Sequence, residues 1–146
     1  MGSLAKKHGL QNCACFNVRK SARVLTQHYD TMMQPVGIRA TQFTILAVLS
    51  TTQGISVTDL SNFLMMDRTT LTRNLRPLET QGLVNTQPGD DKRTRLIKLS
   101  KKGKNKLEKA IPLWKQAQKQ VTEYMGNNRF NDFLTELNYV EKIPSV

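Results

Sequence analysis

The sequence has few cysteines, few aromatic residues and no long apolar run. Its two cysteines, Cys13 and Cys15, are separated by one residue, and a disulfide closing so small a ring would be strained, which excludes a disulfide scaffold. No apolar stretch approaches the roughly 18 residues of a membrane span, and residues 1–8 contain nothing resembling a signal peptide. We therefore expect a cytoplasmic protein that spans no membrane.

Sequence marks of catalysis are also missing. The chain has no glycine-rich phosphate loop, no cluster with metal-ligand spacing and no nucleophile beside a base in a known motif. Cys13 and Cys15 would project about 200° apart on a helix, so they would not hold one ion together. The sequence predicts no metal, no cofactor and no enzymatic activity. A thiol peroxidase using Cys15 is the alternative, which steady-state turnover of peroxide would identify.

Negative charge is scarce as well. The 146 residues include 22 lysines and arginines but 11 aspartates and glutamates, which gives a net charge of +11 and an isoelectric point near 10.0. Such an excess favours a polyanionic partner, either nucleic acid or an anionic membrane surface, with an acidic protein surface as a third option. The length fits one domain, residues 1–146, large enough to bury a core without disulfides.

Apolar residues spaced by three and four predict two helices in the first third of the chain. The first spans 15–33 and ends before the turn residues Pro35 and Gly37. The second, over 41–49, is apolar on nearly every side and is therefore expected to be buried. The narrow apolar stripe of the first helix consists of Cys15, Val18, Ala22, Leu25, Tyr29 and Met32.

Two short helices follow, each beginning at a residue that can cap a helix. Ser56 begins the first and Asp67 the second, which spans 68–79. Pro77 predicts a kink near the end of the second helix, or alternatively an end at Arg76. Two short helices at this spacing, each with one apolar face, outline a helix-turn-helix.

The remainder of the chain predicts a hairpin and two more helices. Extended segments 83–86 and 94–99 flank the turn-forming run 88–92. Ser100 then caps a helix of about two dozen residues, which Asn127-Asn128 ends, and a last helix follows. The predicted fold is mainly α with a small β-hairpin wing, which is the outline of a winged helix-turn-helix.

The positive charge is concentrated in residues 67–106, which hold eleven basic and four acidic residues, a net charge of +7. With the leucines of helix 68–79 turned inward, its outward face presents Arg68, Thr69, Thr72, Arg73 and Arg76. Arginine can pair with two acceptors of guanine, and threonine can bond a phosphate or pack on thymine, so this face suits the major groove. A solvated helix face is the alternative. Lys101 and Lys102 oppose the dipole of their helix, a cost that a DNA phosphate would offset, although exposed lysines also tolerate it.

Several motifs together resemble the MarR family of transcription regulators. The resemblance spans almost the whole chain and is carried by Thr41-Gln42-Phe43, Asp67-Arg68-Thr69-Thr70-Leu71-Thr72-Arg73, Leu78-Glu79-x-x-Gly82-Leu83-Val84 and Asp91-Lys92-Arg93. It implies an interleaved homodimer in which residues 10–34 and 101–146 form the helical dimerisation part and residues 38–100 the winged helix-turn-helix. An apolar stripe too large for a monomer surface independently favours a two-fold dimer.

The resemblance also implies which residues meet DNA. Helix 68–79 would enter the major groove, Arg93 would reach the adjacent minor groove, and Asp91 would hold that arginine in place. The full set of predicted DNA-binding residues is Ser56, Arg68, Thr69, Thr70, Thr72, Arg73, Arg76, Asp91, Lys92, Arg93, Arg95, Lys101 and Lys102.

A redox signal is one candidate effector. The run Leu10-x-Asn12-x-x-Cys15-Phe16 and Tyr29 look like the reactive-cysteine region of the organic-hydroperoxide-sensing subgroup. Fourteen helical residues rise about 21 Å, so Tyr29 would reach Cys15 only from an antiparallel partner chain. The alternative is that Cys15 is an ordinary apolar residue of the stripe.

A small aromatic ligand is the other candidate effector. Phe43, Met32 and Trp114 are candidate lining residues of a ligand pocket, with plain core packing as the alternative. The leading hypothesis is a sequence-specific regulator, most often a repressor in this family. It would bind a pseudo-palindromic operator in double-stranded DNA as a homodimer and be released by a small ligand or an oxidant, with no membrane partner. The alternatives are a thiol-based redox regulator using Cys15 and a non-specific architectural DNA-binding protein.

Overall fold

The computed structural model describes residues 2–144. Short helical segments begin the chain, and the first of them was not predicted. In chain order the elements are α1 (Gly2–Lys7), η1 (Leu10–Asn12), α2 (Ala14–Met33), η2 (Gln34–Val36), α3 (Ala40–Ser50), β1 (Ile55–Ser56), α4 (Val57–Phe63), α5 (Arg68–Thr80), β2 (Val84–Pro88), β3 (Arg95–Leu99), α6 (Lys101–Met125) and α7 (Asn127–Val140). The predicted class, mainly α with a small antiparallel sheet, is confirmed.

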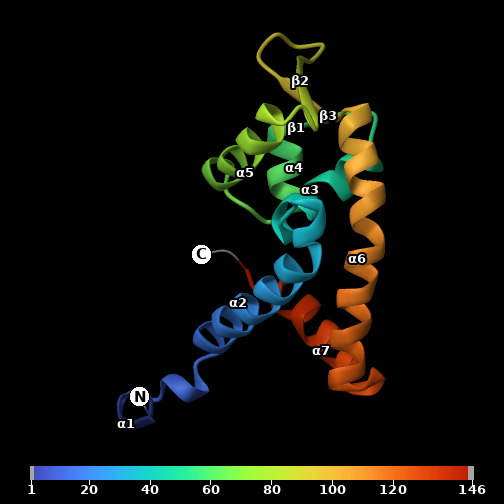
Figure 1. Ribbon diagram of the computed structural model, residues 1–146. Coiled ribbons are helices and arrows are strands. Elements are labelled where there is room, and N and C mark those ends of the chain that lie inside the picture. Colours follow the sequence, from blue (N-terminus) through green and yellow to red (C-terminus); the bar gives the residue numbers. More distant parts are fainter. Residues whose placement is uncertain (1, 145–146) are drawn as a thin grey trace.

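The molecule divides into a lobe and a helical part (Figure 1). The lobe contains α3, α4, α5 and the sheet, and the β2–β3 loop projects from it. The helical part consists of α2 and α6, which leave the lobe and diverge, and of α7, which folds back at the far end of α6. The base of the lobe is joined to the helical part by two hydrogen bonds. Asp30 Oδ1 accepts from Ala40 N at 2.7 Å, and Lys106 Nζ donates to Val36 O at 2.7 Å.

Three helices begin as the capping residues predict. Ser56 Oγ accepts from Asp59 N at 3.0 Å, Asp67 Oδ1 accepts from Thr70 N at 2.8 Å, and Ser100 Oγ accepts from Gly103 N at 3.0 Å. Each side chain satisfies a backbone N–H that has no partner within its helix. These caps fix the starts of α4, α5 and α6.

The predicted helix 68–79 is observed as α5, which continues through Pro77 to Thr80, and the alternative end at Arg76 is wrong. The internal proline removes one hydrogen bond, while the bond from Gln81 N to Pro77 O still closes the last turn. Helix α6 ends at Met125 and is followed by Gly126, whose φ is 82°, so the break is at this glycine and not at Asn127-Asn128, which begin α7. Glycine adopts this left-handed φ without steric cost.

The sheet has three antiparallel strands in the order β1-β3-β2, one more than predicted. Strand β1 pairs Ile55 with Ile97. A strand of two residues is too short to show an alternating pattern in the sequence. Pro88, expected in the turn, is the last residue of β2 and lies opposite Arg95. An edge strand tolerates a proline because its outer side needs no donor.

Burial is uneven between the two parts. Most of the large side chains that are fully buried come from the lobe, and Met33 at the end of α2 is the exception. Those of the lobe are Ile45, Leu46, Leu49, Leu60, Leu71, Leu78, Leu83 and Ile97. In the helical part, Leu107, Ala110 and Ala117 of α6 are buried, whereas Tyr124 is 92% exposed. Within the described chain, α7 contributes no buried residue.

Candidate nucleic-acid interface

The outward side of α5 forms a basic face. We call Arg68, Thr69, Thr72, Arg73 and Arg76 the α5 face; all five are exposed and together line one shallow hollow of about 390 Å³. The opposite side of the same helix buries Leu71, Leu75 and Leu78 in the lobe core. The burial of these leucines fixes the rotation of α5 and therefore aims the arginines at solvent.

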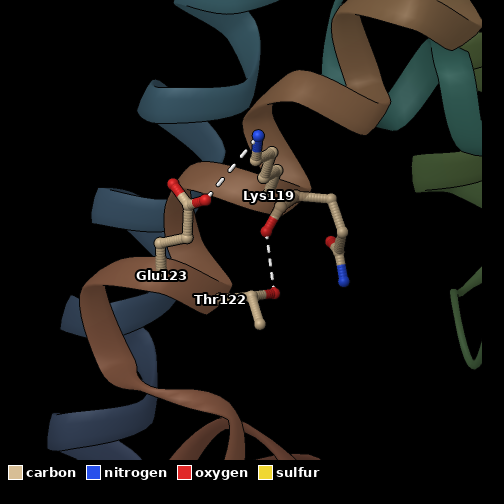
Figure 2. Close-up of polar contacts among 4 residues, drawn as sticks. Lys119, Thr122 and Glu123 are labelled. Atoms are coloured by element: carbon tan, nitrogen blue, oxygen red, sulfur yellow. Dashed lines mark hydrogen bonds and ion pairs between the residues drawn. The ribbon is translucent and has the colours of Figure 1, made fainter.

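The α5 face has no neutralising carboxylate among the described residues. Over residues 2–144 the one ion pair is Lys119 Nζ with Glu123 Oε1 at 3.7 Å, on the exposed side of α6, where Thr122 Oγ1 also donates to Gln118 O (Figure 2). Near α5, Glu79 Oε1 accepts from the hydroxyl of Thr86 at 2.6 Å. The three guanidinium groups therefore remain available to an external anion.

Two of the predicted DNA-binding residues serve the helix ends. Ser56 Oγ both accepts from Asp59 N and donates to Asp59 Oδ2 at 2.8 Å. Thr70, half-buried, donates its N–H and its hydroxyl to the two carboxylate oxygens of Asp67, at 2.8 and 2.7 Å. These bonds, the backbone one first, hold the pKa of the Asp67 carboxyl below its ordinary value. The cap therefore stays ionised at neutral pH.

The β2–β3 loop and the start of β3 carry three further exposed cations. Its turn is closed by bonds from Gly89 N to Thr94 O at 2.7 Å and from Thr94 N to Asp91 O at 2.8 Å. Asp91 Oδ1 accepts from Arg93 N at 3.1 Å, so this carboxylate holds the backbone of Arg93. The guanidinium of Arg93 forms no ion pair in the described chain. Lys92, Arg93 and Arg95 are exposed along this loop and the start of β3.

The two lysines at the start of α6 have different surroundings. Lys102 Nζ donates to Gln81 O at 2.8 Å, at the C-terminal end of α5, where the helix dipole favours a cation. A lysine in the first turn of α6 opposes the dipole of that helix, and the sequence suggested that a DNA phosphate would offset this cost. The contact with Gln81 O offsets it within the chain. Lys101 instead lines an open hollow of about 360 Å³ together with Lys98 and Lys104.

A close backbone approach that sequence reasoning missed joins the wing to α6. A Cβ on Gly103 would overlap the carbonyl oxygen of Leu83, and Ser100 donates its N–H to that oxygen at 3.1 Å. Ser100 Oγ also donates to Gly82 O at 2.6 Å. The available signal in the sequence was the spacing Ser100-x-x-Gly103, although the position of a glycine alone does not identify such a contact.

The predicted redox residues lie far apart along α2. Cys15 is exposed in the first turn, and Cys13 precedes the helix, with its Sγ accepting from Phe16 N at 3.5 Å. Cys13 is therefore a cap and not a helical residue. Tyr29, fourteen residues after Cys15, donates its hydroxyl to Gln118 Oε1 of α6 in the same chain, and burial raises its pKa.

The candidate ligand pocket contains two of its three predicted residues. A cavity of about 210 Å³ is lined by Phe43 and Trp114, whose rings stack at 5.5 Å with an interplanar angle of 17°. Met33, not Met32, lines it, because the last turn of α2 directs Met33 into the core. Tyr29 and Ala40 also line this cavity, so it lies where the helical part meets the lobe.

A larger groove was not anticipated from the sequence. It has a volume of about 640 Å³ and is lined by residues of α2, α6 and α7, among them Val24, His28, Tyr124 and Phe133. His28 Nε2 is buried there without a hydrogen-bond partner in the described chain. The surface of this groove is mostly apolar, and Val24 and Tyr124 are largely exposed in it.

Two classes of site find no support in the described residues. In residues 2–144 no group of three or more histidine, cysteine or acidic side chains is arranged to hold a metal ion. None of the helices that the structure describes has the length and apolarity needed to cross a membrane.

Comparison with known proteins yields consistent matches. The family model described as MarR family matches residues 38–94, which include α3 through the β2–β3 loop. The organic hydroperoxide resistance transcriptional regulator of Bacillus subtilis is 30% identical over 105 residues, 71% of each chain. The HTH-type transcriptional regulator YwoH, also of B. subtilis, is 29% identical over 91 residues, which are 62% of this chain and 66% of YwoH.

A solved structure extends the similarity to nearly the whole chain. The transcriptional regulator MosR of M. tuberculosis, crystallised in complex with DNA, is 37% identical with a TM-score of 0.75. The match covers 90% of this chain and 99% of MosR. The likeness therefore includes the helical part as well as the lobe.

Proposed function

The chain belongs to the MarR family of transcriptional regulators, and from this premise we propose that it is a sequence-specific repressor that binds a pseudo-palindromic operator as a homodimer. The observation that carries the proposal is the α5 face, which presents three arginines without a carboxylate partner in the described chain beside a wing with three further cations. Helix α5 would lie in the major groove and Arg93 in the adjacent minor groove. Lys92, Arg95 and Lys101 would meet phosphates.

A second copy of the chain is the proposed occupant of the 640 Å³ groove. The groove continues into apolar side chains that are exposed on α2 and α7, including Val18, Val24 and Leu134. A two-fold interface between these helices would cover the same patch on both copies. On a pseudo-palindromic operator the two α5 helices of such a dimer would need to lie about 34 Å apart, one turn of DNA. Residues 10–34 and 101–146 would then be the dimerisation part, and 38–100 the DNA-binding part.

Release from DNA requires an effector that favours a different spacing of the lobes. The cavity lined by Phe43 and Trp114 is a candidate site for a small aromatic ligand, because it touches both α2 and the base of the lobe. A ligand seated there would act on the joint at which Asp30 bonds Ala40 N. Oxidation of the exposed Cys15 is the second route, favoured by the similarity to a hydroperoxide resistance regulator.

The proposal is tested by measuring binding to the chain's own upstream DNA against random duplex across a salt series. We expect a strong preference for the upstream fragment, and a logarithm of affinity that falls linearly with the logarithm of salt concentration. Equal affinity for both DNAs would contradict the proposal and favour an architectural protein. Lys115→Ala, which removes an exposed charge from α6 away from the wing, is the control for loss of charge alone.

The effector is tested with the same DNA after peroxide treatment. If Cys15 is the sensor, peroxide lowers the affinity of the wild type and of Cys13→Ser, whereas Cys15→Ser keeps its affinity. A change that persists in Cys15→Ser would exclude this thiol. A regulator consumes about one equivalent of peroxide and stops, whereas a thiol peroxidase turns over continuously, so peroxide consumption in the steady state separates the two classes.

A further inference from the structure

The α5 face can donate hydrogen bonds to a base but has little left with which to accept them. Its three arginines are donors only. Asn74 is the single amide side chain of α5, and it is turned inward, where Nδ2 donates to Thr70 O at 3.0 Å and contacts Met66 Sδ at 3.9 Å. Helix α5 therefore offers no amide to the edge of adenine, which presents one acceptor and one donor.

The carboxylates near this face accept hydrogen bonds within the chain, and one of its hydroxyls donates one. Both oxygens of Asp67 accept from Thr70, and Glu79 Oε1 accepts from Thr86. Thr72 Oγ1 donates to Arg68 O at 2.8 Å. A cytosine amine, which needs an acceptor, thus finds no free carboxylate on the α5 face. Its hydroxyl oxygens are the remaining acceptors.

Guanine has the complementary edge. In the major groove it presents two adjacent acceptors, N7 and O6, and the planar guanidinium fork fits both at once. Arg73 lies between Arg68 and Arg76, about 7.5 Å and 4.5 Å away along the helix axis at 1.5 Å per residue. Arg73 is therefore the central guanidinium of the face, and its two neighbours can reach flanking phosphates or bases.

We propose that Arg73 reads a guanine in each half-site, so that the ligand of this chain is duplex DNA with a guanine at that position and not an operator read through adenine. The inference rests on the proposed function. It assigns the base identity from the excess of hydrogen-bond donors over acceptors on the α5 face and from the engagement of half-buried Asn74 within the chain.

The first experiment selects binding sites from a random duplex pool with the full chain. The proposal expects two-fold related half-sites, each with one strongly required guanine. A motif whose half-sites contain only required A·T pairs would overturn the guanine assignment while leaving the proposed function intact. Failure to enrich any motif would overturn both.

The second experiment asks whether Arg73 is the residue that contacts this guanine. Each selected guanine is replaced in turn by 7-deazaguanine, which lacks the N7 acceptor, and by inosine, which keeps N7 and O6 and lacks the minor-groove amine. With the wild type we expect one 7-deaza position to lower affinity about 5-fold or more, within the range of a bidentate arginine contact. Inosine at that position should leave the affinity unchanged.

Variants of Arg73 test whether the effect of the 7-deaza substitution depends on this side chain. In Arg73→Ala the 7-deaza substitution should cost nothing further, because its partner is gone. Arg73→Lys keeps the charge, so the salt dependence should be retained while discrimination between guanine and adenine falls. Lys115→Ala should behave as the wild type. An equal 7-deaza penalty in wild type and Arg73→Ala would assign the contact to another residue and overturn the proposal.

Discussion

The lobe and the helical part of this chain bury their apolar residues to very different extents. In the lobe, α3, α4, α5 and the sheet enclose leucines and isoleucines that are completely shielded from solvent. In the helical part, α6 buries Leu107, Ala110 and Ala117, whereas Tyr124 near its end is 92% exposed, and α7 buries nothing within the described chain. The lobe core is thus enclosed within one chain, whereas the helical part leaves apolar side chains such as Val24 and Leu134 exposed.

The difference separates two kinds of stability. A core formed within one chain should respond to substitution in the same way at every protein concentration. A surface completed by a second copy should couple stability to concentration, because association favours the folded state by mass action. Substitutions in the two parts therefore distinguish them experimentally.

The largest effect is expected from a cavity in the lobe core. Leu46 is fully buried on α3, and Leu46→Ala should lower the free energy of unfolding by about 2–5 kcal/mol, measured by urea denaturation. Asn62→Ala, at an exposed position of α4, is the matched control and should change it by less than about 0.5 kcal/mol. A loss in Leu46→Ala similar to that of the control would contradict a closed lobe core.

A second large effect is expected where the lobe meets the helical part. Gly103→Ala places a methyl group against the carbonyl oxygen of Leu83, so either the wing or α6 must shift. Overpacking of this kind costs about 1–3 kcal/mol or more, seen as a lower melting temperature. Lys104→Ala, exposed on the adjacent position, should melt close to the wild type. Unchanged melting of Gly103→Ala would show that the backbone at this junction adjusts freely.

An intermediate effect is expected on assembly. Val24 is 69% exposed in one chain and lines the 640 Å³ groove, so Val24→Asp should raise the dissociation constant of the proposed dimer about tenfold or more. Light scattering after size exclusion, performed over a concentration series, measures this directly. Lys109→Asp, exposed on α6, controls for added negative charge. A mass that corresponds to one chain for the wild type would refute the second copy as the occupant.

The sequence predicted the lobe better than the helical part. Leucine spacing and the caps Ser56 and Asp67 are local signals, so α4 and α5 and the outward placement of Arg73 followed from them. Strand β1 did not, because two residues carry no periodicity and its pairing with Ile97 is distant in the sequence. The inward turn of Asn74 and the bond from Lys102 to Gln81 depend on packing between elements, which spacing along one helix does not report.

The sequence predicted the helices of the helical part, but not the shape of the surfaces that they form. Apolar stripes on 15–33 and on the last two helices indicated that a partner was needed. They did not reveal the groove beside His28 or that Met33 replaces Met32 in the cavity. Both depend on the angle at which α2 crosses α6, which follows from tertiary packing and not from periodicity.

The smallest effect concerns the bond that holds α2 to α6. Tyr29→Phe removes the hydroxyl that donates to Gln118 Oε1, which should lower the free energy of unfolding by about 0.5–1.5 kcal/mol at pH 7. Because burial raises the folded-state pKa of Tyr29 above its ordinary value of 10.0, the stability from its neutral form is present below pH 10 and is lost as the pH rises through the raised pKa.

Urea denaturation at pH 7 and above pH 10 measures both parts of this expectation. The wild type should lose stability relative to Tyr29→Phe at the higher pH, because only the wild type must keep a phenol neutral at the joint between α2 and α6. Tyr124→Phe is the matched control, since that ring is 92% exposed in one chain. An alkaline loss that is the same in wild type and Tyr29→Phe would assign it to other groups and leave the Tyr29–Gln118 bond without a measurable role in holding the two helices together.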